Sequence, residues 1–292
     1  MKLIPTGIES FKEIFDKNYY YVDKTNLIQD VLNEKVVLYT RPRRFGKTLN
    51  MSMLYYFFSI KEKENAYLFD GLNISKNKEA LKHQNQYPTL FITLKDMKNS
   101  SYEKQMNRFK EVICLCAKSH LELLNSERLL ASEKKLFQKY VDNETEDNEL
   151  EKSLFNISYF LYKHYHQKVI ILIDEYDVPL QAAYQYNYYD EMVEFLRSVF
   201  SSALKTNDAL EKGIMTGCLR ISKESIFTGL NNFKAYSILY KSKNEYFGFT
   251  ENEVLQLLKD YNLTDYIDEV KEWYDGYLFG NIEIYNPWST LM

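Results

Sequence analysis

Short apolar runs, separated by stretches with helical periodicity, constrain the fold more than any other feature of this sequence. Each run is too short for a buried helix and is typical of a strand covered on both faces. Strands that alternate with helices along a chain form a parallel sheet with helices packed on its faces, so the sequence predicts an α/β fold. The predicted strands are residues 36–40, 89–95, 169–175 and 213–219, with 235–240 as a weaker fifth, and the predicted helices between them are residues 48–58, 102–124, 150–164 and 190–204.

The composition fits one medium-sized core with a small appendage. A length of 292 residues is typical of about two domains. The contents of 45% hydrophobic and 27% charged residues are ordinary for a globular protein. The formal net charge of −4 offers no general attraction for a polyanion, so we expect no direct nucleic-acid binding. The three cysteines cannot build a disulfide framework in a chain this long, which favours a reducing compartment. With no signal peptide and no apolar run of the roughly 20 residues that span a membrane, we expect a cytoplasmic, soluble protein without a membrane partner.

A phosphate-binding loop is predicted where the first apolar run meets the first helix. Residues 41–48 read Arg-Pro-Arg-Arg-Phe-Gly-Lys-Thr and place Gly46, Lys47 and Thr48 at this junction. Backbone N–H groups and the positive end of the helix surround phosphates there, the lysine ammonium reaches the outer phosphates, and the threonine hydroxyl ligates magnesium. Gly46 lets the backbone approach the ligand because it has no Cβ. The predicted nucleotide-binding residues of the loop are Pro42, Arg43, Arg44, Phe45, Gly46, Lys47, Thr48 and Leu49.

The loop departs from the usual G-x-x-x-x-G-K-S/T pattern because Arg41 holds the first glycine position. Pro42 favours extended geometry for Arg41, which makes the loop stiffer and more basic. The alternative is a basic surface turn before an amphipathic helix. Since the three arginines of the loop cannot all contact one triphosphate, we expect Arg44, close to Gly46, to contribute more to ATP binding than Arg41. We expect Lys47 to face solvent.

Two adjacent carboxylates end the third apolar run. In parallel sheets ligands bind beyond the C-terminal ends of the strands, which is where Asp174 and Glu175 would lie. Asp174 and Thr48 are the predicted magnesium ligands, with Asp174 acting through water, and Glu175 is the predicted general base that polarises the attacking water. The alternative for acids at this position is a helix N-cap. The predicted strand at 89–95 separates the two motifs in sequence, which together with the Asp-Glu pair indicates P-loop proteins that hydrolyse ATP with an additional central strand.

Two further candidates follow the fourth apolar run. Thr216 is a candidate sensor of the γ-phosphate or the attacking water, and the alternative is a threonine that simply packs on the sheet. Arg220 would stabilise transition-state charge, and the alternative is an ordinary surface ion pair. The predicted catalytic residues are therefore Glu175, Lys47, Thr216 and Arg220.

The sequence changes character after residue 240. Thr250 and Glu253 form a capping box that opens one helix, and Thr264 opens a second. Two helices after the last strand predict a small helical lid, which would be cut short because the chain stops at Met292. The expected division is residues 1–35 as an N-terminal segment leading into the core, 36–245 as the P-loop ATPase core and 246–292 as the start of the lid.

Several blocks together resemble the bacterial AAA-ATPase-like family, a branch of P-loop NTPases near the STAND and archaeal-type ATPases. The resemblance covers almost the whole chain and includes the Arg-Pro-Arg-Arg-Phe-Gly-Lys form of the loop. It implies a three-layer αβα fold with a parallel sheet. Members often carry, after this part, a PD-(D/E)XK nuclease-like domain that is not visible in this sequence. The blocks are YYVDKT at 20–25, RPRRFGKT at 41–48, DEYD at 174–177, LRISKESIF at 219–227, GLNN at 229–232, YFGFT at 246–250, WYDGY at 273–277 and YNPWS at 285–289.

The resemblance also bears on ligands and function. Related STAND proteins place a lid proline against adenine, and Pro287 is the matching candidate, with a turn proline as the alternative. The predicted function is binding and Mg²⁺-dependent hydrolysis of ATP, coupled to a conformational change in a partner protein or appended domain. The alternative is a nucleotide-gated interaction module or switch with little or no hydrolysis. A GTPase is weaker because no N/T-K-x-D segment follows Asp174, and a small-molecule kinase is weaker because no second-substrate pocket can be named.

Overall fold

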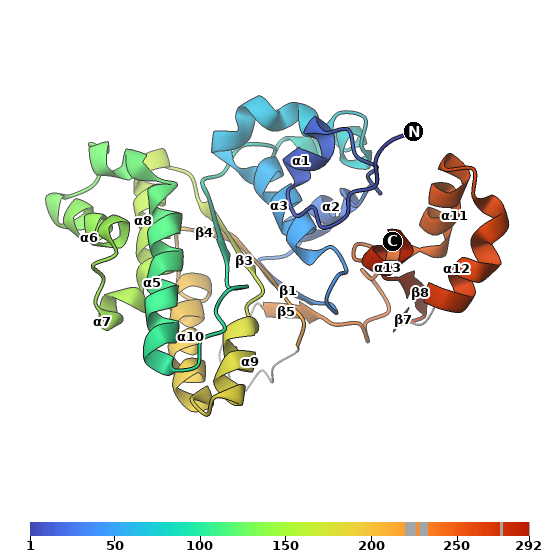
Figure 1. The fold of residues 1–292 in the computed structure, drawn as a ribbon. Helices are drawn as coiled ribbons and strands as arrows, with labels where there is room; N and C mark the ends of the chain where they lie inside the picture. Colours follow the sequence, from blue (N-terminus) through green and yellow to red (C-terminus); the bar gives the residue numbers. More distant parts are fainter. Residues whose placement is uncertain (220–225, 228–232, 275–276, 292) are drawn as a thin grey trace.

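The computed structural model describes residues 1–219, 226–227, 233–274 and 277–291. Its centre is a five-stranded sheet in which every paired strand runs parallel to its neighbour, in the order β2-β3-β4-β1-β5. The predicted α/β class is confirmed (Figure 1). The strands are β1 Val36–Thr40, β2 Thr89–Thr93, β3 Val169–Asp174, β4 Leu210–Gly217 and β5 Phe233–Tyr236.

Strand β4 lies between β1 and β3 in the sheet, although it follows both of them in sequence. Tyr39 of β1 pairs with Thr216, and Ile173 of β3 pairs with Met215. This register brings the C-terminal ends of the three strands side by side. An additional strand therefore separates the loop strand from the acidic strand, as predicted, and that strand is β4, whereas β2 lies at the edge of the sheet.

Helices cover both faces of the sheet, so the predicted three-layer arrangement is confirmed (Figure 1). Side chains of β3 alternate between the faces, as the pleat of a strand requires. Val169, Ile171 and Ile173 belong to one core cluster, and Ile170 and Leu172 belong to the other. Burial on both sides explains why this strand is a continuous apolar run. The first face carries α5 Tyr102–Lys118, α6 Ala131–Asp142, α8 Ser153–Tyr165 and α10 Tyr189–Leu204, and the second carries α1 Phe11–Asp16, α2 Asn26–Leu32 and α3 Lys47–Phe58.

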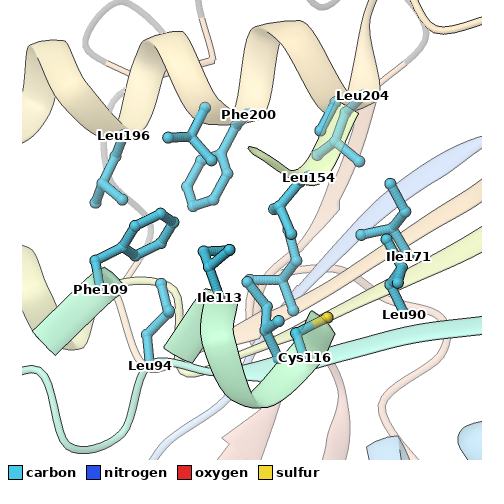
Figure 2. Close-up of a cluster of buried hydrophobic side chains, with 14 of the residues drawn as sticks. Leu90, Leu94, Phe109, Ile113, Cys116, Leu154, Ile171, Leu196, Phe200 and Leu204 are labelled. Atoms are coloured by element: carbon cyan, nitrogen blue, oxygen red, sulfur yellow. The ribbon is translucent and has the colours of Figure 1, made fainter. Parts of the chain in front are cut away.

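The core of the first face is built from interlocking apolar side chains. Figure 2 shows Phe109 and Ile113 of α5, Leu154 of α8, Phe200 of α10 and Ile171 of the sheet in one cluster, and all five are buried. Each such side chain contributes about 1.5–3 kcal/mol by its removal from water. This packing holds β3, and hence the acids at its end, in a fixed position.

Strand β4 begins at Leu210, earlier than the predicted residue 213. The reason is Lys212, a buried residue in the strand whose ammonium donates hydrogen bonds to the backbone carbonyls of Leu32 (2.8 Å) and Glu34 (2.9 Å). Carbonyls at the end of a helix lack intrahelical donors, and a lysine can satisfy them. A charged residue in this role interrupts the apolar pattern, so the pattern alone placed the start of the strand too late.

The C-terminal part contains both predicted helices, α11 Glu251–Asp260 and α12 Ile267–Tyr274. The capping box is present, because the hydroxyl of Thr250 accepts from the Glu253 N–H and the Glu253 carboxylate accepts from the Thr250 N–H. A three-stranded antiparallel sheet, in the order β6-β8-β7, lies beside these helices and was not predicted. The remaining elements here are β6 Phe249–Thr250, β7 Tyr277–Phe279, β8 Ile282–Tyr285 and α13 Pro287–Leu291.

Shorter elements complete the described part of the chain. The predicted helix at 102–124 is divided into α5 and a separate 3-10 turn, η3 Leu121–Asn125. None of the helices within the described ranges has the length and apolar character that crossing a membrane requires. The other short elements are η1 Ile60–Phe69, η2 Asn73–Lys76, α4 Lys78–Leu81, α7 Asp147–Leu150, α9 Val178–Gln185 and η4 Thr264–Tyr266.

Candidate nucleotide-binding site

The candidate site lies at the C-terminal ends of β1, β3 and β4, where residues 41–46 connect β1 to α3. Gly46 closes this loop with φ of 77°, in the left-handed region that an L side chain rarely adopts. Helix α3 begins directly afterwards at Lys47, so its first backbone N–H groups have no intrahelical acceptor. The predicted strand-to-helix junction is therefore present, with the free N–H groups that bind phosphates in such turns.

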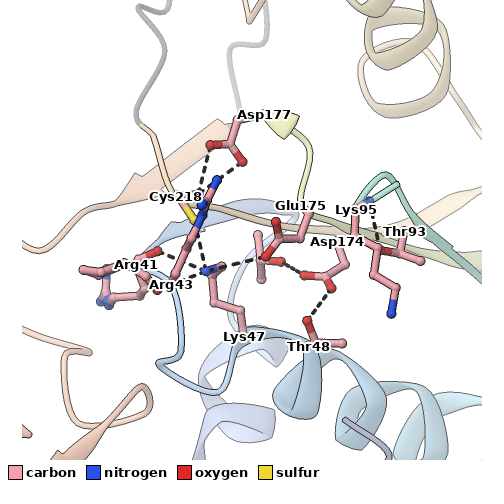
Figure 3. A network of polar contacts seen from close by, with 12 residues as sticks. Arg41, Arg43, Lys47, Thr48, Thr93, Lys95, Asp174, Glu175, Asp177 and Cys218 are labelled. Atoms are coloured by element: carbon pink, nitrogen blue, oxygen red, sulfur yellow. Dashed lines mark hydrogen bonds and ion pairs between the residues drawn. The ribbon is translucent and has the colours of Figure 1, made fainter. Parts of the chain in front are cut away.

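Lys47 is buried, with 4% of its surface exposed, so the expectation that it faces solvent is wrong. Its ammonium donates hydrogen bonds to the backbone carbonyls of Arg41 (3.2 Å) and Pro42 (3.0 Å) and to the sulfur of Cys218 (3.3 Å). It also pairs with Glu175 Oε1 at 3.8 Å (Figure 3). The burial arises because the lysine side chain folds back over its own loop.

Asp174 connects the end of β3 to helix α3 and to strand β4. Its carboxylate accepts a hydrogen bond from the hydroxyl of Thr48 at 2.7 Å and another from the hydroxyl of Thr216. Burial raises the pKa of Asp174, although the two hydroxyl groups and the nearby Lys47 act in the opposite direction. The structure thus brings together the three predicted residues Thr48, Asp174 and Thr216.

Glu175 follows in the left-handed backbone conformation, with φ of 56°. This conformation costs a non-glycine residue about 1–2 kcal/mol, and such strain is concentrated at functional sites. The carboxylate is half-buried. Burial, reinforced by the neighbouring carboxylates of Asp174 and Asp177, raises the pKa of Glu175, whereas Lys47 and Arg43 lower it. A carboxylate with a raised pKa is a stronger base.

Arg41 is fully buried and directed away from the Asp174 carboxylate (Figure 3). Its guanidinium donates hydrogen bonds to the carbonyls of Tyr236 (2.7 Å) and Lys243 (3.0 Å) and to the side-chain oxygen of Asn244 (3.0 Å). Burial lowers the pKa of Arg41 to about 10. The residue at the first glycine position therefore joins the start of the loop to the chain that follows β5.

The other predicted loop residues differ in direction. Arg43 and Arg44 are exposed. Arg43 donates to the side chain of Gln181 at 3.3 Å, whereas the Arg44 guanidinium lies over the Trp288 ring at 4.8 Å. Phe45 is buried in the second core cluster.

A cavity of about 420 Å³ adjoins the loop, within the usual size range of small-molecule sites. Most of its walls come from three parts of the chain: residues between 5 and 24, the turn and start of α3 between 44 and 50, and residues between 246 and 291. The predicted residues Thr48, Leu49 and Pro287 line it, as do Lys47 and Glu175. Arg220, the predicted transition-state cation, lies outside the described residues.

Three residues at the site were not predicted from the sequence. Asp177 is buried and accepts a hydrogen bond from the Cys218 N–H at 3.1 Å. Lys24 is buried beside the cavity, and its ammonium contacts the Glu253 carboxylate and the Glu245 carbonyl at 2.6 Å each. Asp177 lies in the block DEYD at 174–177, and Lys24 lies in the block YYVDKT at 20–25. The charged residues of these blocks could have been used to predict that both side chains belong to the site. The position of Cys218 depends on β4 lying beside β1, for which the sequence carries no local signal.

A parallel sheet with β4 between β1 and β3, and a Gly-Lys-Thr turn at its C-terminal edge, defines a P-loop NTPase-like three-layer fold. Residues 5–227 match the family described as Predicted AAA-ATPase, and the chain belongs to this AAA-ATPase-like family. Family membership supports nucleotide binding.

A relative is known from Azotobacter chroococcum mcd 1, with the description "Uncharacterized protein in vnfD 5'region". It is 26% identical over 295 residues, and the match covers 100% of this chain and 51% of the relative. The chain thus spans about half the length of that protein. No solved structure matches the chain.

Proposed function

We propose that the chain binds ATP and hydrolyses it with Mg²⁺ at the edge of the sheet where β1 and β3 end. The observation that carries this proposal is the meeting of Lys47, Thr48, Asp174 and Glu175 beside a cavity of about 420 Å³. An ammonium, a hydroxyl and two carboxylates are the groups needed to bind a triphosphate and to activate water. Membership of the AAA-ATPase-like family supports the same conclusion.

Phosphate binding would redirect the ammonium of Lys47. In its present position the ammonium contacts two loop carbonyls, at 3.2 and 3.0 Å, and the carboxylate of Glu175, at 3.8 Å. Phosphate oxygens carry more charge than carbonyl oxygens and would replace them as acceptors. The free N–H groups and the dipole at the start of α3 would stabilise the same anion.

Thr48 and Asp174 would hold the magnesium ion. Both offer oxygen ligands, which Mg²⁺ prefers, and their oxygens are 2.7 Å apart. Mg²⁺ usually takes only one or two carboxylates from a protein and keeps several waters. When bound, the ion would neutralise charge on the phosphates.

Glu175 is the proposed general base. Its carboxylate would accept a proton from a water molecule as that water attacks the γ-phosphorus, and the bond to the leaving ADP oxygen would break. The raised pKa of Glu175 favours this proton transfer. Thr216, whose hydroxyl is bound to Asp174, is the proposed sensor next to this water.

The walls of the cavity provide a route from nucleotide state to conformation. A nucleotide there would contact the N-terminal segment, the loop and the C-terminal part at once. We propose that residues 36–245 form the catalytic core and that residues 1–35 and 246–292 close over the ligand, the latter as a lid. Closure would then act on a partner protein or an appended domain.

The test is ATP turnover by the purified chain beside Lys47→Ala and Glu175→Gln. We expect turnover in the parent chain, no ATP binding in Lys47→Ala, and ATP binding without turnover in Glu175→Gln, because an amide cannot accept the proton from water. The ion pair between Lys47 and Glu175, at 3.8 Å, favours a second candidate, a nucleotide-gated switch with little hydrolysis, because it engages the carboxylate of the proposed base. Equal ATP binding in the parent chain and Glu175→Gln, with no turnover in either, would select the switch.

A further inference from the structure

Asp177 is a fully buried carboxylate that the proposed reaction does not use. It lies two positions after Glu175 and occupies the N-cap position of α9 Val178–Gln185. An aspartate at this position ordinarily accepts a hydrogen bond from an N–H of its own helix. Asp177 accepts no hydrogen bond from a backbone N–H of α9, so its side chain does not cap this helix and is free to bind a second element.

That element is the chain leaving β4. The carboxylate of Asp177 accepts hydrogen bonds from the backbone N–H of Cys218 at 3.1 Å and of Leu219 at 2.9 Å (Figure 3 draws the contact to Cys218). It also accepts from the side chain of Gln181 at 2.8 Å. Two consecutive N–H groups directed at one carboxylate fix both the position and the orientation of the segment that carries them.

Contacts of Tyr176 reinforce this connection. Its hydroxyl donates to the carbonyl of Leu219 at 2.7 Å, and its backbone N–H donates to the carbonyl of Thr216 at 3.0 Å. A Cβ added at Gly217 would lie 2.5 Å from the Tyr176 ring and 2.6 Å from the Asp177 carboxylate. Any side chain at Gly217 would therefore displace the end of β4. Tyr176 and Asp177, which follow β3, thus determine the position of this end.

The segment held in this way carries two groups that contact the proposed reaction centre. Thr216 donates its hydroxyl to Asp174, and Cys218 places its sulfur 3.3 Å from the ammonium of Lys47. A shift of the end of β4 would move both groups together. The loop and the start of α3, which would bind the phosphates, make no hydrogen bond to Asp177 among the described residues.

We propose that Asp177 is a positioning residue for ATP hydrolysis. By holding the chain after β4, it sets where the hydroxyl of Thr216 stands relative to Asp174 and the attacking water. Asp177 acts through Cys218 and Leu219 and touches no reacting atom. The inference rests on the proposed ATPase function, and it predicts that turnover depends on Asp177 while nucleotide affinity does not.

The test compares Asp177→Asn with the parent chain in ATP turnover, ATP affinity and thermal unfolding. A misplacement of about 1 Å at a reaction centre can cost on the order of 100-fold in rate, so we expect kcat to fall by about that factor. The dissociation constant for ATP should stay within about threefold of the parent value, the pattern of an interaction that acts only in the transition state. Asp190→Asn, the same substitution at an exposed site on α10, should match the parent in every measurement.

Two further variants separate positioning from general stability. Tyr176→Phe removes one contact to Leu219 while the carboxylate stays in place, so it should lower kcat by a smaller factor without weakening ATP affinity. In a double variant, Asp177→Asn should cost little beyond Thr216→Val alone, because both changes act through the same hydroxyl and coupled sites are not additive.

Several outcomes would overturn the positioning role of Asp177 or the proposed function. Loss of ATP affinity in parallel with kcat, or additive effects in the double variant, would make Asp177 a structural residue and overturn the inference. An unchanged kcat for Asp177→Asn beside a turning-over parent would overturn the inference alone. If Asp177→Asn fails to fold, an unchanged kcat for Tyr176→Phe has the same meaning. A parent chain without ATP turnover would overturn the proposed function and the inference together.

Discussion

Arg41 occupies the loop position that most often holds glycine, and its charge is placed in the core. Burial of a guanidinium is costly unless its N–H groups find acceptors. Four hydrogen bonds satisfy both terminal nitrogens, whereas Nε has no hydrogen-bond partner among the described residues. The rings of Phe247 and Phe279 lie 5.2 and 5.5 Å from the charge and stabilise it further. Since three of these hydrogen bonds go to residues of 236–244, Arg41 connects the loop to that segment.

Arg41→Met should therefore destabilise the fold. It leaves the backbone carbonyls of Tyr236 and Lys243 without this donor, at about 1–3 kcal/mol each, so we expect the free energy of unfolding to fall by about 2–6 kcal/mol. Arg43→Met is the matched control at an exposed loop position and should change the free energy of unfolding by less than about 0.5 kcal/mol. Urea denaturation measures both. Equal stability of the two variants would contradict the structural role of Arg41.

Glu175 predicts a pH dependence with a defined direction. The proposed base must be ionised to accept a proton, and burial raises its pKa. As the pH falls, a carboxylate with a raised pKa is protonated before an ordinary glutamate, whose pKa is about 4.3. The loss of turnover on acidification should therefore begin at a pH higher than that value. The acid limb of kcat/KM against pH measures this. Turnover that persists undiminished into the ordinary range would remove Glu175 from the role of base.

The loop of residues 41–48 presents its arginines unequally, which yields a prediction about ATP affinity. Arg44 borders the cavity and lies over Trp288, whereas Arg43 points to Gln181. A charge-assisted hydrogen bond to phosphate contributes about 1.5–3 kcal/mol, so Arg44→Ala should raise the dissociation constant for ATP at least about tenfold. Arg43→Ala, an exposed charge screened by salt, should raise it less than about fivefold. The reverse order in matched titrations would place Arg43 on the phosphates. The first expectation compared Arg44 with Arg41. Arg43 is the better comparison, because a substitution of the buried Arg41 would also disturb the loop.

Strands that are defined by a local apolar pattern could be predicted from the sequence. Strand bounds that depend on contacts with distant residues could not. The strands β1 and β3 are continuous apolar runs, and they were predicted with correct starts. The start of β4 was obscured by Lys212, whose acceptors lie in a distant part of the chain. The hairpin of β7 and β8 was missed because both strands are too short for a periodic signal, although the two-residue turn at Gly280, with φ of 59°, was a usable cue.

The same distinction applies to the candidate site. Lys47, Thr48, Asp174 and Glu175 were found because each pair is contiguous in sequence and follows an apolar strand. The contact of Asp177 with the chain after β4 depends on the strand order, which pattern does not give. The direction of the Arg41 side chain likewise depends on acceptors about two hundred residues away in the chain.

Across the whole molecule, the cavity joins segments from both ends of the sequence. Lys24 in the N-terminal part pairs with Glu253 of α11 at 2.6 Å, and a Cβ added at Gly7 would lie 3.8 Å from the Trp288 ring. A ligand that fills the cavity would stabilise all of these segments together, because binding to the folded state lowers the population of open states. We therefore expect ATP to slow amide hydrogen exchange in residues 5–9, 20–24 and 287–291. The same experiment on Lys47→Ala should give no protection, and protection of these residues in that variant would show that nucleotide binding does not depend on Lys47.

Binding of the ATP phosphates by the loop of residues 41–48 can be measured by calorimetric titration of the chain with Mg²⁺ and ATP. The parent chain and Glu175→Gln should each bind one nucleotide with similar affinity, because Glu175 acts on water rather than on the phosphates. Lys47→Ala should show no binding while it unfolds cooperatively like the parent. Unchanged affinity for ATP in folded Lys47→Ala would show that this loop does not bind the phosphates.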